Sequence, residues 1–162
     1  MLQLNLPTYQ FRIKQEQNSY IIWDSIRNKY VKLTPEEWVR QHFLQYFMQE
    51  KQFPKGLLSV EQQLNINGMK KRCDAVFYNR QKKPEIILEF KAPTVEITQA
   101  VFDQVAVYNS KLSVRYFVVS NGISHYFCRV NTDSSQYEFF SEIPDYNQLF
   151  PKYLLNFVES LP

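Results

Sequence analysis

The 162-residue chain contains only three glycines, which argues against a glycine-rich loop that holds nucleotide phosphates. Neither a GxGxxG nor a GxxxxGK[ST] segment occurs, so we expect no nucleotide-driven motor within these residues. Two cysteines, Cys73 and Cys128, are too few for a disulfide framework. No apolar run approaches the roughly 18 residues of a membrane helix, and the N-terminus lacks a signal-peptide core. We therefore expect a soluble, cytoplasmic protein with no membrane partner.

Hydrophobic and aromatic side chains, in contrast, are abundant. Hydrophobic residues make up 44% of the chain and include 13 Phe and 11 Tyr, enough to bury a sizeable core. The length fits one domain over residues 1–162, with N-terminal strands in 1–33, a central core in 34–130 and a C-terminal strand and helix in 131–162. The net charge of +3 permits contact with a polyanion without requiring it.

The N-terminal region has the pattern of short strands. Tyr9, Phe11 and Ile13 alternate with polar residues, which is the period of a strand. Residues 20–23 and 30–33 could pair as a hairpin.

A helix is expected to begin at Thr34 and to end before Pro54. Thr34 is a suitable N-cap, Pro35 suits the first helical position, and Glu37 would complete a capping box with Thr34. We expect His42 on the surface beside the apolar stripe. That stripe comprises Val39, Phe43, Leu44 and Phe47.

Turn signals and hydrophobic runs divide the rest of the chain. Asn67–Gly68 between residues 57–66 and 70–79 predicts a hairpin. The further expected elements are a strand covered on both faces at 85–91, a helix at 98–112, strands at 114–120 and 123–130 around Asn121–Gly122, an edge strand at 136–140 and a closing helix at 145–161. This order predicts an α/β fold with a mixed central β-sheet flanked by α-helices and an N-terminal β-hairpin region.

Three charged residues at the ends of the expected central strands suggest chemistry. Glu89 and Lys91 are two positions apart and project to the same side of a strand, while Phe90 points into the core. Asp74 lies 15 positions before Glu89 (89 − 74), and the intervening turn would let their strands pair. Two adjacent carboxylates repel unless a cation neutralises them.

Oxygen ligands of this kind suit Mg²⁺, and an ion with an adjacent lysine supplies what phosphodiester hydrolysis needs. From the residues alone an alternative stays open. Asp74 could lie in a turn, and Glu89 with Lys91 could form an exposed ion pair on an edge strand.

The surrounding segments are more specific than this spacing. TPEEWVRQHFLQYF, KRCDAVFYN, PEIILEFKAP, FDQVAVYN and VVSNG, in this order over roughly residues 30–130, resemble the N-terminal nuclease domain of type I restriction enzyme R subunits. The D-x(14)-E-x-K core resembles the PD-(D/E)xK phosphodiesterase superfamily, although Cys73 stands where the superfamily name has proline. No helicase segment follows in these residues, so we expect a stand-alone version.

The resemblance implies roles for individual residues. It implies that Asp74, Glu89 and the backbone carbonyl of Phe90 bind Mg²⁺, for which Mn²⁺ would substitute, and that Lys91 is the catalytic lysine. Gln104 and Tyr108 match the family's Q-x-x-x-Y motif. Spaced i and i+4 on a helix, the two side chains share one face. Without the resemblance they would be read as a solvated Gln and a Tyr at the edge of the core.

The family often supplies another acid from the first helix, and Glu36 and Glu37 compete for this role. Glu37 is already explained by the capping box. Glu36 falls on the apolar stripe and is therefore expected to face inward, with Arg40 as an alternative ion-pair partner. We choose Glu36.

The resulting expectation is a divalent-metal-dependent DNA endonuclease, with restriction–modification subunits or a second copy of the chain as partners. The alternative is a non-catalytic nucleic-acid-binding or assembly module that keeps the nuclease fold. His125 and Cys128 fall on opposite faces of a strand and predict no zinc site, and nothing favours them as a nucleophile pair. Backbone phosphates of DNA could be contacted by Lys70, Lys71, Arg72, Arg80, Lys82 and Lys83.

Overall fold

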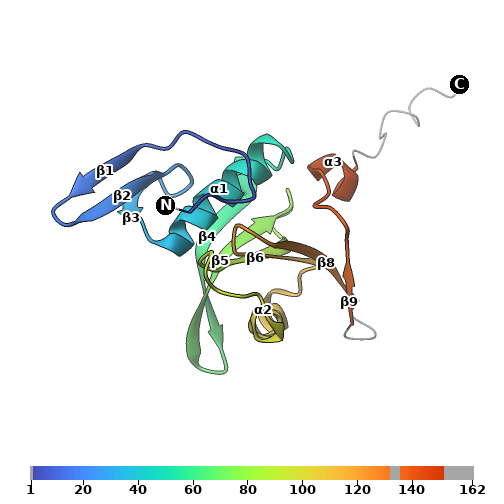
Figure 1. The fold of residues 1–162 in the computed structure, drawn as a ribbon. Helices are drawn as coiled ribbons and strands as arrows, with labels where there is room; N and C mark the ends of the chain where they lie inside the picture. Colours follow the sequence, from blue (N-terminus) through green and yellow to red (C-terminus); the bar gives the residue numbers. More distant parts are fainter. Residues whose placement is uncertain (1, 132–135, 152–162) are drawn as a thin grey trace, which may run out of the picture.

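A computed structural model describes residues 2–131 and 136–151, and within them the chain forms two β-sheets with flanking helices (Figure 1). The strands are β1 (Ile13–Glu16), β2 (Ser19–Asp24), β3 (Lys29–Lys32), β4 (Leu58–Ile66), β5 (Met69–Tyr78), β6 (Pro84–Phe90), β7 (Tyr116–Ser120), β8 (His125–Asn131) and β9 (Gln136–Phe139). The helices are α1 (Pro35–Gln49), the 3-10 turn η1 (Lys55–Leu57), α2 (Gln99–Leu112) and α3 (Tyr146–Leu149).

The larger sheet has six strands in the order β4-β5-β6-β7-β8-β9, and the smaller sheet has the order β1-β2-β3. Strands β6 and β7 are parallel, whereas the other neighbours are antiparallel. Helix α2 makes the crossover that a parallel pair requires. The predicted α/β fold, with a mixed sheet and an N-terminal hairpin region, is confirmed. The boundaries of the single domain stay a prediction.

Two hydrophobic clusters pack on opposite faces of this sheet, with α1 above it and α2 below it in Figure 1. Phe43 and Phe47 of α1 are fully buried on one side, and Val105 of α2 is fully buried on the other. Strand β6 supplies Leu88 to the first cluster and Ile87 to the second. The prediction of a central strand covered on both faces is therefore confirmed.

The hairpin predicted around Asn67–Gly68 is present as β4 and β5. Asn67 and Gly68 both have positive φ values, 51° and 77°, as a two-residue hairpin turn requires. The hairpin predicted from residues 20–23 and 30–33 is present, with β2 and β3 paired over 21–24 and 29–32 and the Leu33 N–H donating to the Tyr20 carbonyl oxygen. Strand β9 pairs with β8 at the edge of the described sheet.

Helix α1 begins as predicted, because the Thr34 hydroxyl accepts a hydrogen bond from the Glu37 N–H at 3.1 Å. The second bond of the expected capping box, from the Thr34 N–H to the Glu37 carboxylate, is replaced by other contacts. The Glu37 carboxylate accepts hydrogen bonds from Arg27 at 2.9 Å and from Gln41 at 2.7 Å. Glu37 thus joins the helix to the β2–β3 turn.

The expected strand over Tyr9, Phe11 and Ile13 was wrong for its first part, since β1 begins only at Ile13. Phe11 packs on α1 instead, with its ring 4.6 Å from His42 and 5.5 Å from Trp38. The prediction that His42 lies on the surface was wrong for the same reason. The side chain is 5% exposed because the N-terminal segment covers this part of α1.

The closing helix predicted over 145–161 ends much earlier in the part that the structure describes. Helix α3 stops at Leu149, and Phe150 is no longer helical. Pro151 follows, and a residue before proline disfavours the helical conformation. Residues 152–161 lie outside the described residues. No helix among the described residues is long and apolar enough to cross a membrane.

Candidate active site

Asp74 and Glu89 lie on neighbouring strands at the edge where β6 ends. The register of β5 and β6 pairs Ala75 with Leu88, so one step further Asp74 stands opposite Glu89. Asp74 Oδ2 accepts a hydrogen bond of 2.7 Å from the backbone N–H of Phe90, the residue after Glu89. The side chain of Phe90 is fully buried in the cluster on the α1 side. The adjacency expected from the hairpin is therefore present.

Glu89, Lys91, Gln104 and Tyr108 form one chain of hydrogen bonds. Lys91 Nζ donates to Glu89 Oε1 at 2.8 Å and to Gln104 Oε1 at 3.0 Å. Gln104 Nε2 donates to Glu89 Oε1 at 2.7 Å and to the Tyr108 hydroxyl at 2.7 Å. Helix α2 places Gln104 and Tyr108 one turn apart, with Val105 buried between them. The structure thus brings the Q-x-x-x-Y pair directly onto the E-x-K strand.

The Glu89 carboxylate is incompletely satisfied. The residue is 3% exposed, and its Oε2 is buried without a hydrogen-bond partner among the described residues. Burial, followed by the negative charge of Asp74, raises the pKa of Glu89 to about 7, although the hydrogen bond and charge of Lys91 act in the opposite direction. Burial also raises the pKa of Asp74, although Arg40 and the Phe90 N–H act in the opposite direction. Ionising both carboxyl groups at once therefore costs free energy.

The available donors fit a magnesium ion. Asp74, Glu89 and the Phe90 carbonyl are all oxygen ligands. In extended backbone the N–H and C=O of one residue point to the same neighbouring strand, so this carbonyl is directed to the side of Asp74. No group of three or more His, Cys, Asp or Glu side chains positioned to hold a metal occurs among the described residues. Two carboxylates suit Mg²⁺, which keeps several waters, better than a metal that needs a full protein cage.

Lys91 remains a cation in this environment. Burial lowers its pKa, but the hydrogen bond to Glu89 and the charges of Glu89 and Asp74 outweigh this, so its pKa lies above the usual value. At neutral pH the ammonium group can donate to an anion and cannot act as a base.

The two first-helix acids have different positions. The Glu36 side chain is 44% exposed and lies 3.8 Å from Arg40, so it stands at the rim of the site rather than facing fully inward as expected. Burial and the charge of Asp74 raise the pKa of Glu36, which indicates that its carboxylate is near the site. Glu37 is 6% exposed and is used in ion pairs. Glu36 remains the better candidate.

The contacts of two arginines, the buried Arg40 and the partly buried Arg27, were not expected from the sequence. Arg40 is 4% exposed, and its Nη2 donates to Asp74 Oδ1 at 3.2 Å while its Nη1 lies 3.1 Å from Glu37 Oε2. Arg27, from the β2–β3 turn, lies 2.9 Å from Glu37 and 2.8 Å from Glu61. Glu61 also lies 3.5 Å from Arg40. The only sequence signal was the spacing of Arg40 four residues after Glu36.

The remaining His and Cys candidates have ordinary structural roles. His125 lies 2.7 Å from the Ser120 hydroxyl and 2.8 Å from the Asn5 carbonyl oxygen. Burial raises the pKa of both the Cys128 and Cys73 thiols to about 12. Neither cysteine is therefore ionised at neutral pH, and a reactive Cys–His pair is not formed.

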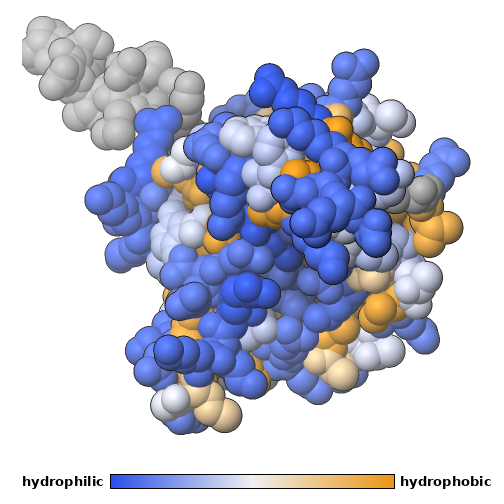
Figure 2. All heavy atoms as spheres, turned by 90° about the vertical axis from the view of Figure 1, so that its left-hand side faces the viewer, coloured by the Kyte–Doolittle hydropathy of each residue, from blue (hydrophilic) through white to orange (hydrophobic). Residues whose placement is uncertain are grey.

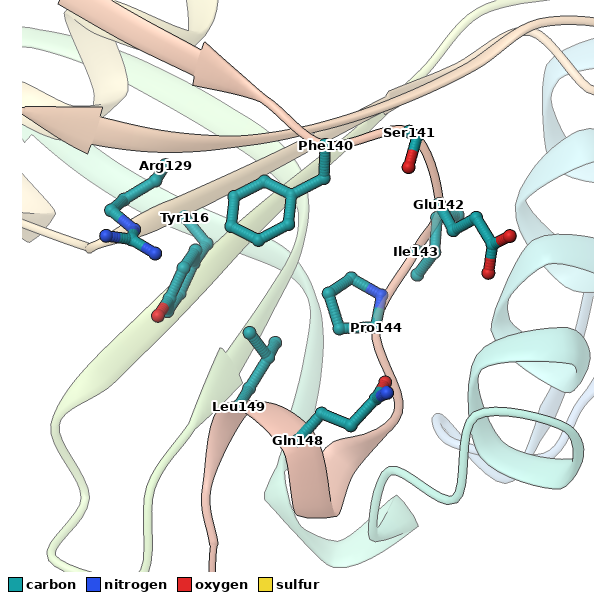
Figure 3. A pocket seen from close by; sticks show the side chains of 9 residues that line it. All are labelled: Tyr116, Arg129, Phe140, Ser141, Glu142, Ile143, Pro144, Gln148 and Leu149. Atoms are coloured by element: carbon teal, nitrogen blue, oxygen red, sulfur yellow. The ribbon is translucent and has the colours of Figure 1, made fainter.

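A cavity of about 350 Å³ lies elsewhere on the sheet (Figure 3). Tyr116 lines it at the start of β7, whereas Ser120 at the other end of β7 pairs with Phe90 beside the candidate site. Phe140, Pro144 and Leu149 also line it. Its lining contains none of the candidate site residues, so the chemistry does not belong to it.

A family model described as the type I restriction enzyme R protein N terminus (HSDR_N) matches residues 35–144. This chain belongs to that family. The matched span begins at the first residue of α1 and contains every candidate site residue, from Glu36 to Tyr108.

A solved structure is similar in fold. It is a fragment described as an HsdR subunit of a type I restriction enzyme from Vibrio vulnificus YJ016, with a TM-score of 0.54 and 17% sequence identity. The similarity covers 73% of this chain and 25% of that one, so the chain spans about a quarter of the length of its structural relative. No curated protein matches the chain.

Proposed function

We propose that this protein is a divalent-metal-dependent DNA endonuclease of the PD-(D/E)xK type, which hydrolyses phosphodiester bonds. The observation that carries the proposal is the buried Glu89 carboxylate, which lies next to Asp74 and Lys91 and has one oxygen without a partner in the described part of the chain. Membership of the restriction R-subunit family supports a nuclease-like domain.

The residues Asp74, Glu89 and the Phe90 carbonyl would hold Mg²⁺, and Mn²⁺ would substitute for it. Such an ion, when bound, supplies an activated water and neutralises charge on the phosphate. Its charge would also offset the burial that raises the pKa values of both acids, and the negative charge of Asp74 that raises the pKa of Glu89 as well.

The protein side chains around these ligands have distinct tasks. The Lys91 ammonium stabilises negative charge on the phosphate oxygens as the bond is broken. Gln104 holds both Lys91 and Glu89 through its amide, and Tyr108 fixes the orientation of that amide. Glu36, at the partly exposed rim, can accept a hydrogen bond from a water molecule that enters the site.

DNA is the proposed substrate, and restriction–modification subunits or a second copy of the chain are the proposed partners. The cytoplasmic location expected from the sequence stays a prediction. The chain spans only part of its structural relative, so the translocating activity of a whole restriction enzyme is not carried over to it.

A non-catalytic binding or assembly module is the second candidate, and one observation favours it. Both oxygens of Asp74 are engaged, Oδ1 by Arg40 and Oδ2 by the Phe90 N–H. An aspartate held in this way could serve only to join the strand to α1. An ion-binding measurement separates the two candidates.

The test uses the purified chain with supercoiled and linear DNA in Mg²⁺, in Mn²⁺ and in EDTA. We expect nicking or degradation with either metal, none in EDTA, and none by Lys91→Ala. The exposed Lys111 on α2 gives the matched control, and Lys111→Ala should cleave like the wild type. Absence of cleavage by folded wild-type protein, together with no Mn²⁺ binding by calorimetry, would favour the module.

A further inference from the structure

The outer half of the β4–β5 hairpin extends beyond the rest of the larger sheet. Strand β6 pairs with β5 only over Ala75–Tyr78, whereas β4 and β5 pair with each other as far as Ile66 and Met69. Figure 1 shows this two-stranded ribbon running away from the sheet toward its tip. Asp74 stands where the ribbon leaves the sheet.

The two faces of this ribbon differ. Leu64 and Ile66 are each 8% exposed and belong to the hydrophobic cluster on the α2 side. Between them the exposed Asn65 points to the other face, opposite Lys70 on the neighbouring strand. The exposed Gln63 pairs with Arg72 in the same way. One face is therefore packed, and the open face presents two cations and two amides.

The open face leads directly into the candidate active site. Alternate residues of a strand share a face, so Lys70, Arg72 and Asp74 follow one another along β5. The contacts agree with this, because Arg72 lies 3.6 Å from Glu61, and Glu61 shares Arg40 with Asp74. A ligand lying along this face would reach the acids at its inner end.

The ribbon is also strongly biased in charge. Residues 62–72 include Lys70, Lys71 and Arg72 but no Asp or Glu, whereas the whole chain has 19 basic and 16 acidic residues. The Arg72 side chain is 61% exposed, so its charge is available to solvent or to a ligand. Figure 2 shows hydrophilic side chains over most of the face on this side of the molecule.

We propose that the open face of the ribbon, formed by Gln63, Asn65, Lys70 and Arg72, binds the phosphate backbone of double-stranded DNA and directs it to the candidate site. The cations would neutralise phosphates, and the amides would donate to phosphate or sugar oxygens. The major groove of a duplex is wide enough to admit a two-stranded ribbon. The cleavage part of the inference rests on the proposed nuclease function, whereas the binding part does not.

The test measures binding of a fluorescent 30-base-pair duplex in EDTA, where cleavage cannot occur, over a range of salt concentrations. The variant is Lys70→Gln with Arg72→Gln. The matched control is Lys55→Gln with Lys111→Gln, two exposed lysines outside the ribbon, in η1 and at the end of α2. Losing two phosphate contacts should reduce the salt slope by about 1.8 and weaken binding by up to about 60-fold at 0.1 M salt. The control pair should change neither quantity to this extent.

Two outcomes would overturn the inference. One is an equal loss of affinity in both double variants, which would mean that only overall charge matters. The other is unchanged binding by a folded Lys70→Gln, Arg72→Gln protein, with folding checked by its melting temperature. If the Lys70→Gln, Arg72→Gln variant alone loses DNA binding and the wild type does not cleave DNA, the DNA-binding role of the ribbon is supported and the proposed nuclease activity is refuted. If the wild type does cleave, the ribbon variant should raise KM and leave kcat within about twofold.

Discussion

Replacing Glu89 with glutamine should make the metal-free protein more stable at high pH. Folding raises the pKa of Glu89 from 4.5 to about 7, chiefly through burial. A group with a raised pKa contributes stability below its unfolded value, and this contribution is lost as the pH rises through the folded value. For a pKa shift of this size, the free energy of unfolding at pH 8 is lower by about 3 kcal/mol than at a pH below 4.5. We reduce the expected gain for Glu89→Gln to about 2 kcal/mol, because Lys91 then lacks an anionic partner.

The assay is thermal unfolding in EDTA at pH 5, 6, 7 and 8. For a domain of this size the melting temperature of Glu89→Gln should exceed that of the wild type by about 4–8 °C at pH 8 and by much less at pH 5. The exposed Glu96 supplies the control, and Glu96→Gln should follow the wild type. Added Mn²⁺ should stabilise the wild type more at pH 8 than at pH 6 and should not stabilise Glu89→Gln. A difference between variant and wild type that is independent of pH would refute this reasoning.

Two further changes test how the surrounding structure holds the site. Arg40→Gln should destabilise the protein by about 3–5 kcal/mol in urea unfolding, because the partly buried Asp74 loses its paired charge and the buried Glu37 keeps only Arg27. Arg40→Lys should recover part of this, and equal stability of all three proteins would contradict the ion-pair role. Gly122→Ala should cost about 1–3 kcal/mol, because φ is +83° and the new Cβ would lie 2.7 Å from Leu4. Gly56→Ala is its control, since no atom lies within 4 Å of a Cβ there, and equal losses would exclude the clash.

Local signals were sufficient for most of the fold. The Asn67–Gly68 turn set the register of β4 and β5, and the apolar run at Ile86–Leu88 identified the central strand. Where a prediction from the sequence was wrong, tertiary packing outweighed the alternation of apolar and polar residues. Phe11 has the spacing of a strand residue but packs against Trp38 and His42 of α1. Alternation alone cannot show that a segment lies on a helix rather than in a sheet.

In the candidate site, too, local spacing predicts some contacts and tertiary packing decides the others. The spacing of Glu89, Lys91 and the Gln104–Tyr108 pair follows from the geometry of one strand and one helix, so the sequence could indicate it. The Arg40–Asp74 contact joins residues 34 positions apart in the chain. No local pattern predicts such a contact, because it depends on how α1 packs across the middle of β5. No sequence pattern indicates the contacts of Arg27 either, because its position depends on how the smaller sheet packs on the rest of the protein.

Each face of the sheet supplies the group that orients one of the two acids. Helix α2 holds Glu89 through Gln104, whereas α1 holds Asp74 through Arg40. The strand contacts from the Phe90 N–H and from Lys91 reach the same two acids, but Gln104 and Arg40 do so only when their helices have packed, so the complete site requires the assembled three-layer core. Residues before the matched span also take part, because Arg27 pairs with Glu37 and Glu61, which both contact Arg40. A shift of the N-terminal sheet would therefore change the charges around Arg40 and, through it, the position of Asp74.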